Sequence, residues 1–234
     1  MDPAGEPSPV DAAIERFARL LGTEQTQPPL DEAALGISAV LQPALDVAAE
    51  LHGLDDLAAS CPEANRDGVV EHLFGRLGFA GDAVTYGNWK HSCLDQVLAS
   101  RRGIPITLSL LTVEVARRLD VELCGVGMPA HFLVGDPSDP HWFVDAFDHG
   151  ATLDRDGCRE LLERVSRGQV RWRDSHLDAT PPRAIVVRML NNLRAGFTQR
   201  PDPVRLALVM RLRMSIAELA DERRAAAQAL AVLN

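Results

Sequence analysis

Two side chains that could do chemistry together, His131 and Asp145, stand on either side of a turn-forming segment. His131 opens the apolar run HFLVGD, and Asp145 lies within the run HWFVDAF. The residues between them, DPSDP, are typical of a turn. We therefore expect an antiparallel hairpin that brings the two side chains together across the ladder. A histidine held by a carboxylate can serve acid–base chemistry or bind a ligand. The simpler alternative is a hydrogen-bonded histidine at the start of a strand.

The element predicted to face this hairpin is a helix over residues 106–119. Gly103 and Ile104 lead into Pro105, and proline suits a first helical turn because that position needs no N–H donor. Apolar residues occupy most sides of the helix, which predicts burial on several faces. Its polar residues, including Thr107 and Ser109, must find partners or point into a cleft. The run VELCGVGMP after the helix is predicted to be a strand.

Three blocks of this region resemble a known family. RRGIPITLSLLTVEVARRL, GVGMPAHFLV and FVDAF together look like the transglutaminase-like core of the bacterial SirB family, over roughly residues 30–215. The resemblance implies an α+β, papain-like fold, in which a central buried helix packs on a small antiparallel sheet with a cleft between them. It also implies tetratricopeptide-like helices at the C-terminus. We expect the cleft to be lined by Pro105, Ser109, Phe132 and Phe147.

In that superfamily the active site combines a cysteine thiolate, a histidine and a carboxylate. His131 and Asp145 match the last two positions. The nucleophile belongs at the start of the central helix, where the helix dipole lowers the pKa of a thiol. This chain has Pro105, Ile106 and Thr107 there, and no cysteine.

Other residues could supply a displaced nucleophile. Cys93 is the strongest cysteine candidate, although a small buried apolar side chain is the commoner role. The hydroxyls of Thr107 and Ser109 are weaker candidates, because helix hydroxyls usually satisfy backbone or core partners.

The rest of the chain is predicted to be largely helical. We expect a mobile N-terminus at 1–10, a transglutaminase-like core with an N-terminal helical part at 11–180, and docked C-terminal helices at 181–234. One pair of helices and a single helix are too few for a freestanding repeat array, which favours docking. A short helix is predicted at 69–79, ended by Gly81, and a later helix is capped by Asp154 or Asp156.

Composition excludes several classes of function. The net charge of −9 argues against nucleic-acid binding as the main task, and no apolar run is long enough to predict a membrane span. Four cysteines without CxxC spacing favour a reducing, cytoplasmic setting. The N-terminus lacks the features of a secretory signal. No phosphate-binding glycine loop is present, and we predict no cofactor.

A metal-binding site is the last kind of functional site to consider. His131, His141 and His149 could gather with Asp139, Asp145 or Asp148 at one end of the hairpin. Their spacing matches no zinc pattern, so we predict no metal.

Three hypotheses follow. The first is a non-catalytic relative of transglutaminase-like hydrolases that binds a peptide or protein segment in the cleft. The second is an active hydrolase or acyltransferase with a displaced nucleophile. The third is a structural adaptor that acts through the exposed faces of helices 183–230.

Overall fold

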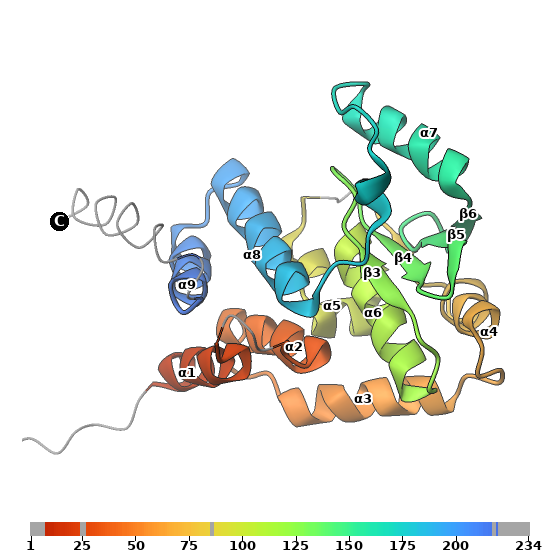
Figure 1. The fold of residues 1–234 in the computed structure, drawn as a ribbon. Coiled ribbons are helices and arrows are strands. Elements are labelled where there is room, and N and C mark those ends of the chain that lie inside the picture. The colour runs from red at the N-terminus through yellow and green to blue at the C-terminus, as the bar shows by residue number, and fades with distance from the viewer. Residues whose placement is uncertain (1–7, 24–26, 85–86, 217–218, 220–234) are drawn as a thin grey trace, which may run out of the picture.

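The computed structural model describes residues 8–23, 27–84, 87–216 and 219, and it has the α+β architecture expected from the sequence. Its helices surround a small antiparallel sheet (Figure 1). The helices are α1 Pro9–Leu21, α2 Leu30–Leu41, α3 Val47–Ala59, α4 Arg66–Val70, α5 Leu94–Ser100, α6 Pro105–Arg118, α7 Arg155–Ser166, α8 Pro182–Gln199 and α9 Pro203–Met214, with the short turns η1 Glu71–Arg76, η2 Trp89–Ser92 and η3 Asp174–Leu177. The strands are β1 Ala80–Gly81, β2 Arg102–Gly103, β3 Cys124–Val126, β4 Leu133–Asp136, β5 Asp139–Asp145 and β6 Ala151–Leu153.

The main sheet is an antiparallel meander in the order β3-β4-β5-β6. The predicted hairpin is present as β4 and β5, with Val134 opposite Val144. Strand β6, which pairs Ala151 with Asp145, is not among the elements predicted from the sequence. This extra strand flanks the end of β5 that carries Asp145.

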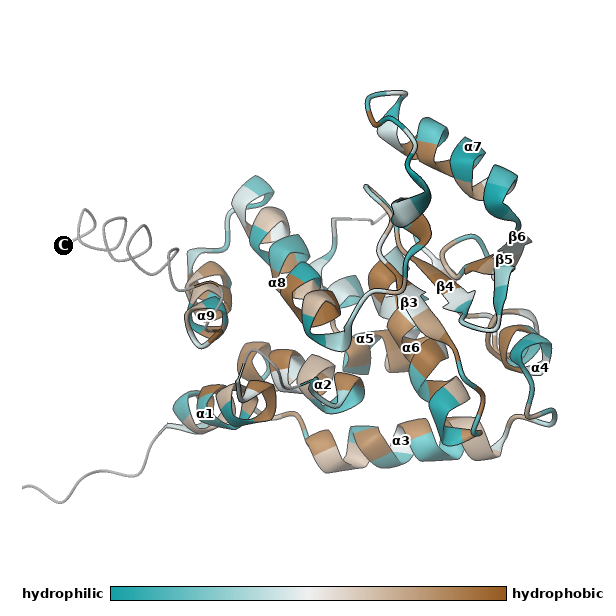
Figure 2. Ribbon diagram, viewed as in Figure 1, coloured by the Kyte–Doolittle hydropathy of each residue, from teal (hydrophilic) through white to brown (hydrophobic). Residues whose placement is uncertain are grey.

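Helix α6 lies between the sheet on one side and α2 and α3 on the other (Figure 1). Apolar residues on most of its faces explain that position, since Leu108, Leu111 and Val115 are all fully buried. Figure 2 colours much of the α6 ribbon brown, the hydrophobic end of the scale. Its start at Pro105 is as predicted, with proline at a position that needs no donor.

Two predicted segments differ from the structure. The helix expected at 69–79 is divided between α4 and the π-helical turn η1, where Leu77 N–H bonds to the carbonyl of His72. Gly78, at φ +71°, then redirects the chain into β1, which pairs with β2 in parallel. The N-terminal helix begins at Pro9 with Ser8 as its cap, so residues 9 and 10 are helical. The rest of the predicted mobile segment lies outside the described residues.

The C-terminal helices pack onto the rest of the molecule. Helix α8 contacts α2, η2 and α6, and its buried residues Ile185, Met189 and Leu193 belong to the same apolar cluster as α6. Helix α9 ends at Met214, and residues 217–218 and 220–234 of the predicted C-terminal helical region lie outside the described residues. Among the helices that the structure describes, none is both long and apolar enough to cross a membrane.

A buried cluster of charges joins α2 to α6. Arg118 bonds to Asp31 at 2.7 Å and to the Glu114 carboxylate at 3.1 Å, and it also reaches Asp55 of α3. Arg117 contacts Asp31 and Glu114 from the more exposed side. Burial alone would raise the pKa of Asp31, but the bond from Arg118 and the neighbouring charges hold it below its ordinary value. Burial, together with the charge of Asp31, raises the pKa of Glu114.

These opposite shifts predict a specific pH dependence of stability. The folded state holds the Glu114 proton to higher pH than the unfolded chain, so this group's contribution to the free energy of unfolding falls as pH rises above about 4.5. Asp31 acts oppositely, and its contribution is lost as pH falls below about 3.8. Urea unfolding between pH 3 and 7 should show the decline above pH 4.5 shrinking in Glu114→Gln. The same decline in both proteins would contradict the assignment.

Candidate active-site cavity

A cavity of about 600 Å³ opens where the start of α6, the end of β5 and helix α7 meet. This volume is in the range of small-ligand sites. The residues that line it are Gly81, Ala83, Pro105, Ala130, His131, Asp145, Phe147, Asp148, His149, Leu161, Arg164 and Val165. They come from segments far apart in the sequence, and the sheet and α6 together hold them in place.

His131 and Asp145 form a hydrogen-bonded pair in the wall of this cavity. Nε2 of His131 donates to Oδ1 of Asp145 at 2.9 Å, and both side chains are buried. The same carboxylate oxygen accepts the backbone N–H groups of Phe147 at 3.0 Å and Asp148 at 3.3 Å. These bonds fix the carboxylate, which in turn fixes the imidazole. The Phe147 ring packs edge-on to the imidazole, with centroids 6.2 Å apart.

The backbone that carries His131 is held from α8. Ala130 has φ 61°, a left-handed conformation that costs a non-glycine residue free energy and needs support from its surroundings. Nη2 of Arg188 donates to the carbonyls of Met128, at 2.7 Å, and His131, at 2.6 Å. The Arg188 guanidinium also lies 5.3 Å from the centroid of the Phe132 ring. Arg188 is therefore a positioning residue for His131, and nothing in its local sequence distinguishes it from the other arginines of the C-terminal region.

The predicted nucleophiles are not in the cavity lining. Cys93 is fully buried between η2 and α5, and burial raises the pKa of its thiol. The hydroxyl of Thr107 is enclosed and has no hydrogen-bond partner within the described residues. The Ser109 hydroxyl donates to the carbonyl of Phe132 at 3.4 Å inside the core.

Cys158 is closer to the pair than its sequence position suggests. It lies on α7, and the charge of Asp145 is among the causes that raise the pKa of its thiol to about 12, after burial and the charge of Asp154. Its side chain is fully buried, so the thiol is kept both protonated and inaccessible. No cysteine is found among the lining residues that the structure describes.

Thiol reactivity tests this description. In the native protein, Ellman's reagent should leave Cys93 and Cys158 unmodified over the time in which partly exposed Cys61 reacts, because thiolate fraction and access set the rate. Mass spectrometry of the labelled peptides after quenching distinguishes the four. Rapid modification of Cys93 under native conditions would contradict its burial and restore it as a candidate nucleophile.

The four residues expected to line the cleft lie in two kinds of place. Pro105 and Phe147 are among the residues that line this cavity, whereas Ser109 and Phe132 are buried in the core and are not among them. The Phe132 ring faces the Arg188 guanidinium. Gly81 makes room for Phe147, since a Cβ at that position would lie 2.3 Å from the ring.

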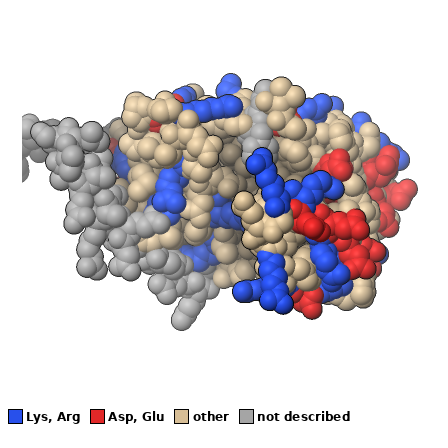
Figure 3. Space-filling view, turned by 90° about the horizontal axis from the view of Figure 1, so that it is seen from above, with Lys and Arg blue, Asp and Glu red and all other residues tan. Residues whose placement is uncertain are grey.

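Helix α7 supplies a wall that sequence reasoning missed. Leu161 and Val165 present apolar surface to the cavity, and Arg164 stands at its rim. The outer side of α7 is charged, with acidic and basic side chains gathered over this end of the molecule (Figure 3). The amphipathic pattern of the helix could have been recognised, but its packing on this cavity is a tertiary contact. Among the described residues, no group of three or more potential ligands gathers to hold a metal ion.

Comparison with known proteins assigns this chain to a family. The model of the transglutaminase-like superfamily matches residues 38–191, which include α6, the main sheet and the His131–Asp145 pair. No solved structure matches the chain significantly.

Curated relatives agree with the family model. A UPF0162 protein of Xylella fastidiosa is 39% identical over 55% of this chain and 47% of its own length. A UPF0162 protein of Pseudomonas aeruginosa is 33% identical over 77% of this chain and 69% of its own. F-box only protein 21 of Mus musculus is 36% identical over 41% of this chain, but over 17% of its own length. The chain thus spans about half the length of the Xylella relative. By the superfamily match and the Pseudomonas relative, this chain belongs to the transglutaminase-like superfamily, among the UPF0162 proteins.

Proposed function

We propose that this chain is a non-catalytic transglutaminase-like protein that binds a peptide or protein segment in the His131 cavity. One observation carries the proposal: an ordered His131–Asp145 pair faces a cavity of about 600 Å³ whose described lining contains no thiol. Cys93 and Cys158 are buried, and neither Cys61 nor Cys124 lines the cavity, so no cysteine thiol stands beside the pair for it to activate. The His131–Asp145 pair is then a preorganised hydrogen-bonding group in the wall of the cavity.

The lining of the cavity suits a chain segment better than a free ion. Phe147, Leu161 and Val165 offer apolar contact area, while His131 and Arg164 offer hydrogen-bonding groups. Arg164 is exposed and forms no ion pair within the described residues, so it is available to a carbonyl or carboxylate oxygen. Apolar walls with a few fixed polar groups are typical of binding sites that orient their ligand.

The test is selection of capped peptides from a defined random library on immobilised protein. His131→Ala should reduce retention of the selected peptides at least tenfold, because it removes a polar group of the site. His141→Ala is the matched control, since His141 is an exposed histidine of β5 outside the cavity lining, and it should retain them fully. Equal retention by His131→Ala would reject the cavity as the binding site and favour the adaptor hypothesis.

Finer assignments belong to the same proposal. We infer a SirB-type protein whose C-terminal helices are tetratricopeptide-like, supported by the packing of α8 against α9. We also infer a reducing, cytoplasmic setting from the four free cysteines.

A further inference from the structure

The atoms of the His131–Asp145 pair that remain free are hydrogen-bond acceptors. The Asp145 side chain is 5% exposed, and its Oδ1 accepts from His131 Nε2 and from two backbone N–H groups. Oδ2 of Asp145 and Nδ1 of His131 have no hydrogen-bond partner within the described residues, and neither atom is enclosed by protein. Both residues line the cavity, so both atoms are open to it. An imidazole that donates from Nε2 accepts at Nδ1, and the wall therefore presents two acceptors.

These acceptors select a ligand that donates. Water can occupy them in the free protein, and a ligand group that displaces this water must reproduce its hydrogen bonds. A carboxylate or carbonyl oxygen cannot do so, because it has no proton to donate. Asp148 lines the same cavity, is exposed, and forms no ion pair within the described residues, so it adds a second carboxylate to that of Asp145. The wall therefore favours a donor that is also a cation.

The basic groups of the lining lie farther out. Arg164 and His149 are exposed, whereas the side chain of Asp145 is buried. A basic side chain that reaches Asp145 passes beyond Arg164, which can then donate to backbone carbonyls of the same segment at the rim. The cavity thus has acceptors inside and a donor outside, which orients a bound segment with its basic side chain inward.

The walls favour a guanidinium over an ammonium group. A guanidinium is planar, holds its N–H donors in a fixed fork, and is less strongly hydrated than an ammonium. Two acceptors on hydrogen-bonded neighbouring side chains suit several donors on one rigid group. The half-buried Phe147 ring offers aromatic surface on which a guanidinium can lie. Leu161 and Val165 offer apolar surface to the aliphatic stem of the same side chain.

We propose that the His131 cavity selects an arginine side chain of the bound segment and holds its guanidinium against Asp145 and His131. This inference rests on the proposed function, since it names the residue by which the peptide is recognised.

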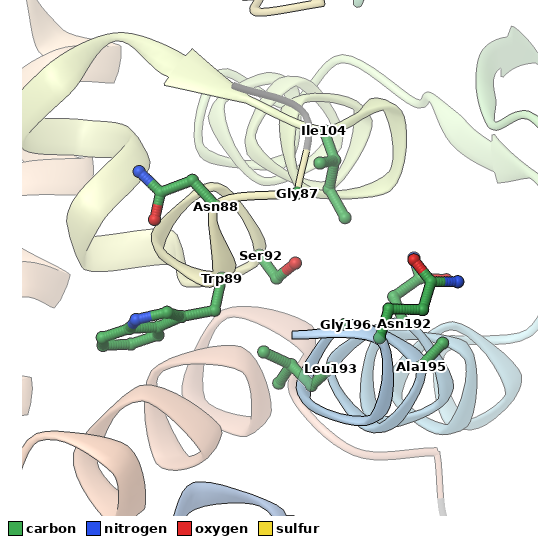
Figure 4. Close-up of a pocket in the computed structure, with 10 residues that line it drawn as sticks. Gly87, Asn88, Trp89, Ser92, Ile104, Asn192, Leu193, Ala195 and Gly196 are labelled. Carbon is green, nitrogen blue, oxygen red and sulfur yellow. The ribbon is translucent and has the colours of Figure 1, made fainter. Parts of the chain in front are cut away.

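A separate pocket between residues 87–92 and α8 provides an internal reference (Figure 4). It has a volume of about 160 Å³, and Asn192 is one of the described residues that line it, none of which is charged. A guanidinium bound there would lose its hydration without a compensating charge. The side-chain amide signals of Asn192 therefore report binding outside the His131 cavity.

The measurement is NMR titration of the full chain with capped pentapeptides that differ only in a central arginine, citrulline, lysine or glutamate. Citrulline has nearly the shape of arginine without its charge. We expect the arginine peptide to shift the backbone amide signals of Phe147 and Asp148 and to leave the Asn192 signals unchanged. The citrulline and glutamate peptides should bind at least tenfold more weakly, because they lack the charge-assisted bonds. The lysine peptide should bind about three- to tenfold more weakly, because it lacks the planar fork.

Two variants test the carboxylate of Asp145. Asp145→Asn keeps an oxygen for the bonds at Oδ1 and places an amide donor at Oδ2, so the preference for arginine over citrulline should fall below about twofold. Asp120→Asn is the matched control. Asp120 is exposed, lies outside the cavity lining, and has φ 56°, a conformation that asparagine tolerates. It removes the same charge and should keep the wild-type preference.

Equal binding of the arginine and citrulline peptides at the His131 cavity would overturn the arginine preference and leave the proposed function standing. Equal binding of the lysine peptide, tighter binding of the glutamate peptide, or an unchanged preference in Asp145→Asn would overturn it in the same way. A shift at Asn192 in place of Phe147 would do so too. If no peptide of this series binds while library-selected peptides still depend on His131, this inference alone fails. If neither set binds, the proposed function fails with it.

Discussion

Arg118→Ala is expected to lower the free energy of unfolding by about 3–5 kcal/mol, the cost of leaving buried charges without their partner. The Arg118 side chain is 11% exposed and bonds to Asp31, Asp55 and Glu114 from three different helices. Without it, the carboxylates of Asp31 and Glu114, which are 5% and 4% exposed, keep only Arg117 as an ion-pair partner. Urea unfolding at pH 7 measures the loss.

Arg117→Ala provides the matched control. Arg117 contacts the same two carboxylates but is 59% exposed, so its loss should cost about 1 kcal/mol or less. Both variants remove one positive charge from α6. The difference between their losses in the free energy of unfolding therefore reports the burial of Arg118 and not the change in net charge. Equal losses in the two variants would show that Arg118 acts through net charge alone.

Arg188→Ala is expected to loosen the backbone that carries His131. The substitution removes charge-assisted bonds to the carbonyls of Met128 and His131, which we expect to cost about 2–3 kcal/mol in the free energy of unfolding. It also leaves the left-handed Ala130 with less support, so the His131 ring should lose its fixed orientation toward Asp145.

Two measurements separate positioning from general stability. Long-range ¹H–¹⁵N NMR of the imidazole should show the His131 signals shifted or broadened in Arg188→Ala. Arg194→Ala removes an exposed arginine from the same helix and should change stability by less than about 0.5 kcal/mol. If Arg188→Ala lowers stability while the His131 signals are unchanged, Arg188 is structural only.

The features predictable from the sequence were those governed by local pattern. Proline at the start of α6, the turn between β4 and β5, and the apolar faces of α6 are each dictated by neighbouring residues, and they suffice to bring His131 and Asp145 together. The strand β6 was not predicted because its three residues are too few to show the alternation of apolar and polar residues that marks a strand, and a helix follows at once.

The remaining features depend on tertiary contacts. Arg188 is separated from His131 by 57 positions, and only the packing of α8 brings it to that backbone. Ser109 and Phe132 have residue types that suit a cleft, yet both are fully buried because α6 and the sheet close over them. The sequence of the π-helical turn η1 has the same amphipathic pattern as an ordinary α-helix, so nothing in it predicts the wider turn.

The most direct test of the central claim combines binding and turnover in one sample. A capped random peptide library is incubated with wild type, His131→Ala and His141→Ala, and bound and unbound peptides are analysed by mass spectrometry. We predict peptides that are retained by wild type and His141→Ala, lost with His131→Ala, and recovered chemically unchanged. Hydrolysis, deamidation or acyl transfer by wild type that disappears in His131→Ala would contradict the account and identify an active enzyme.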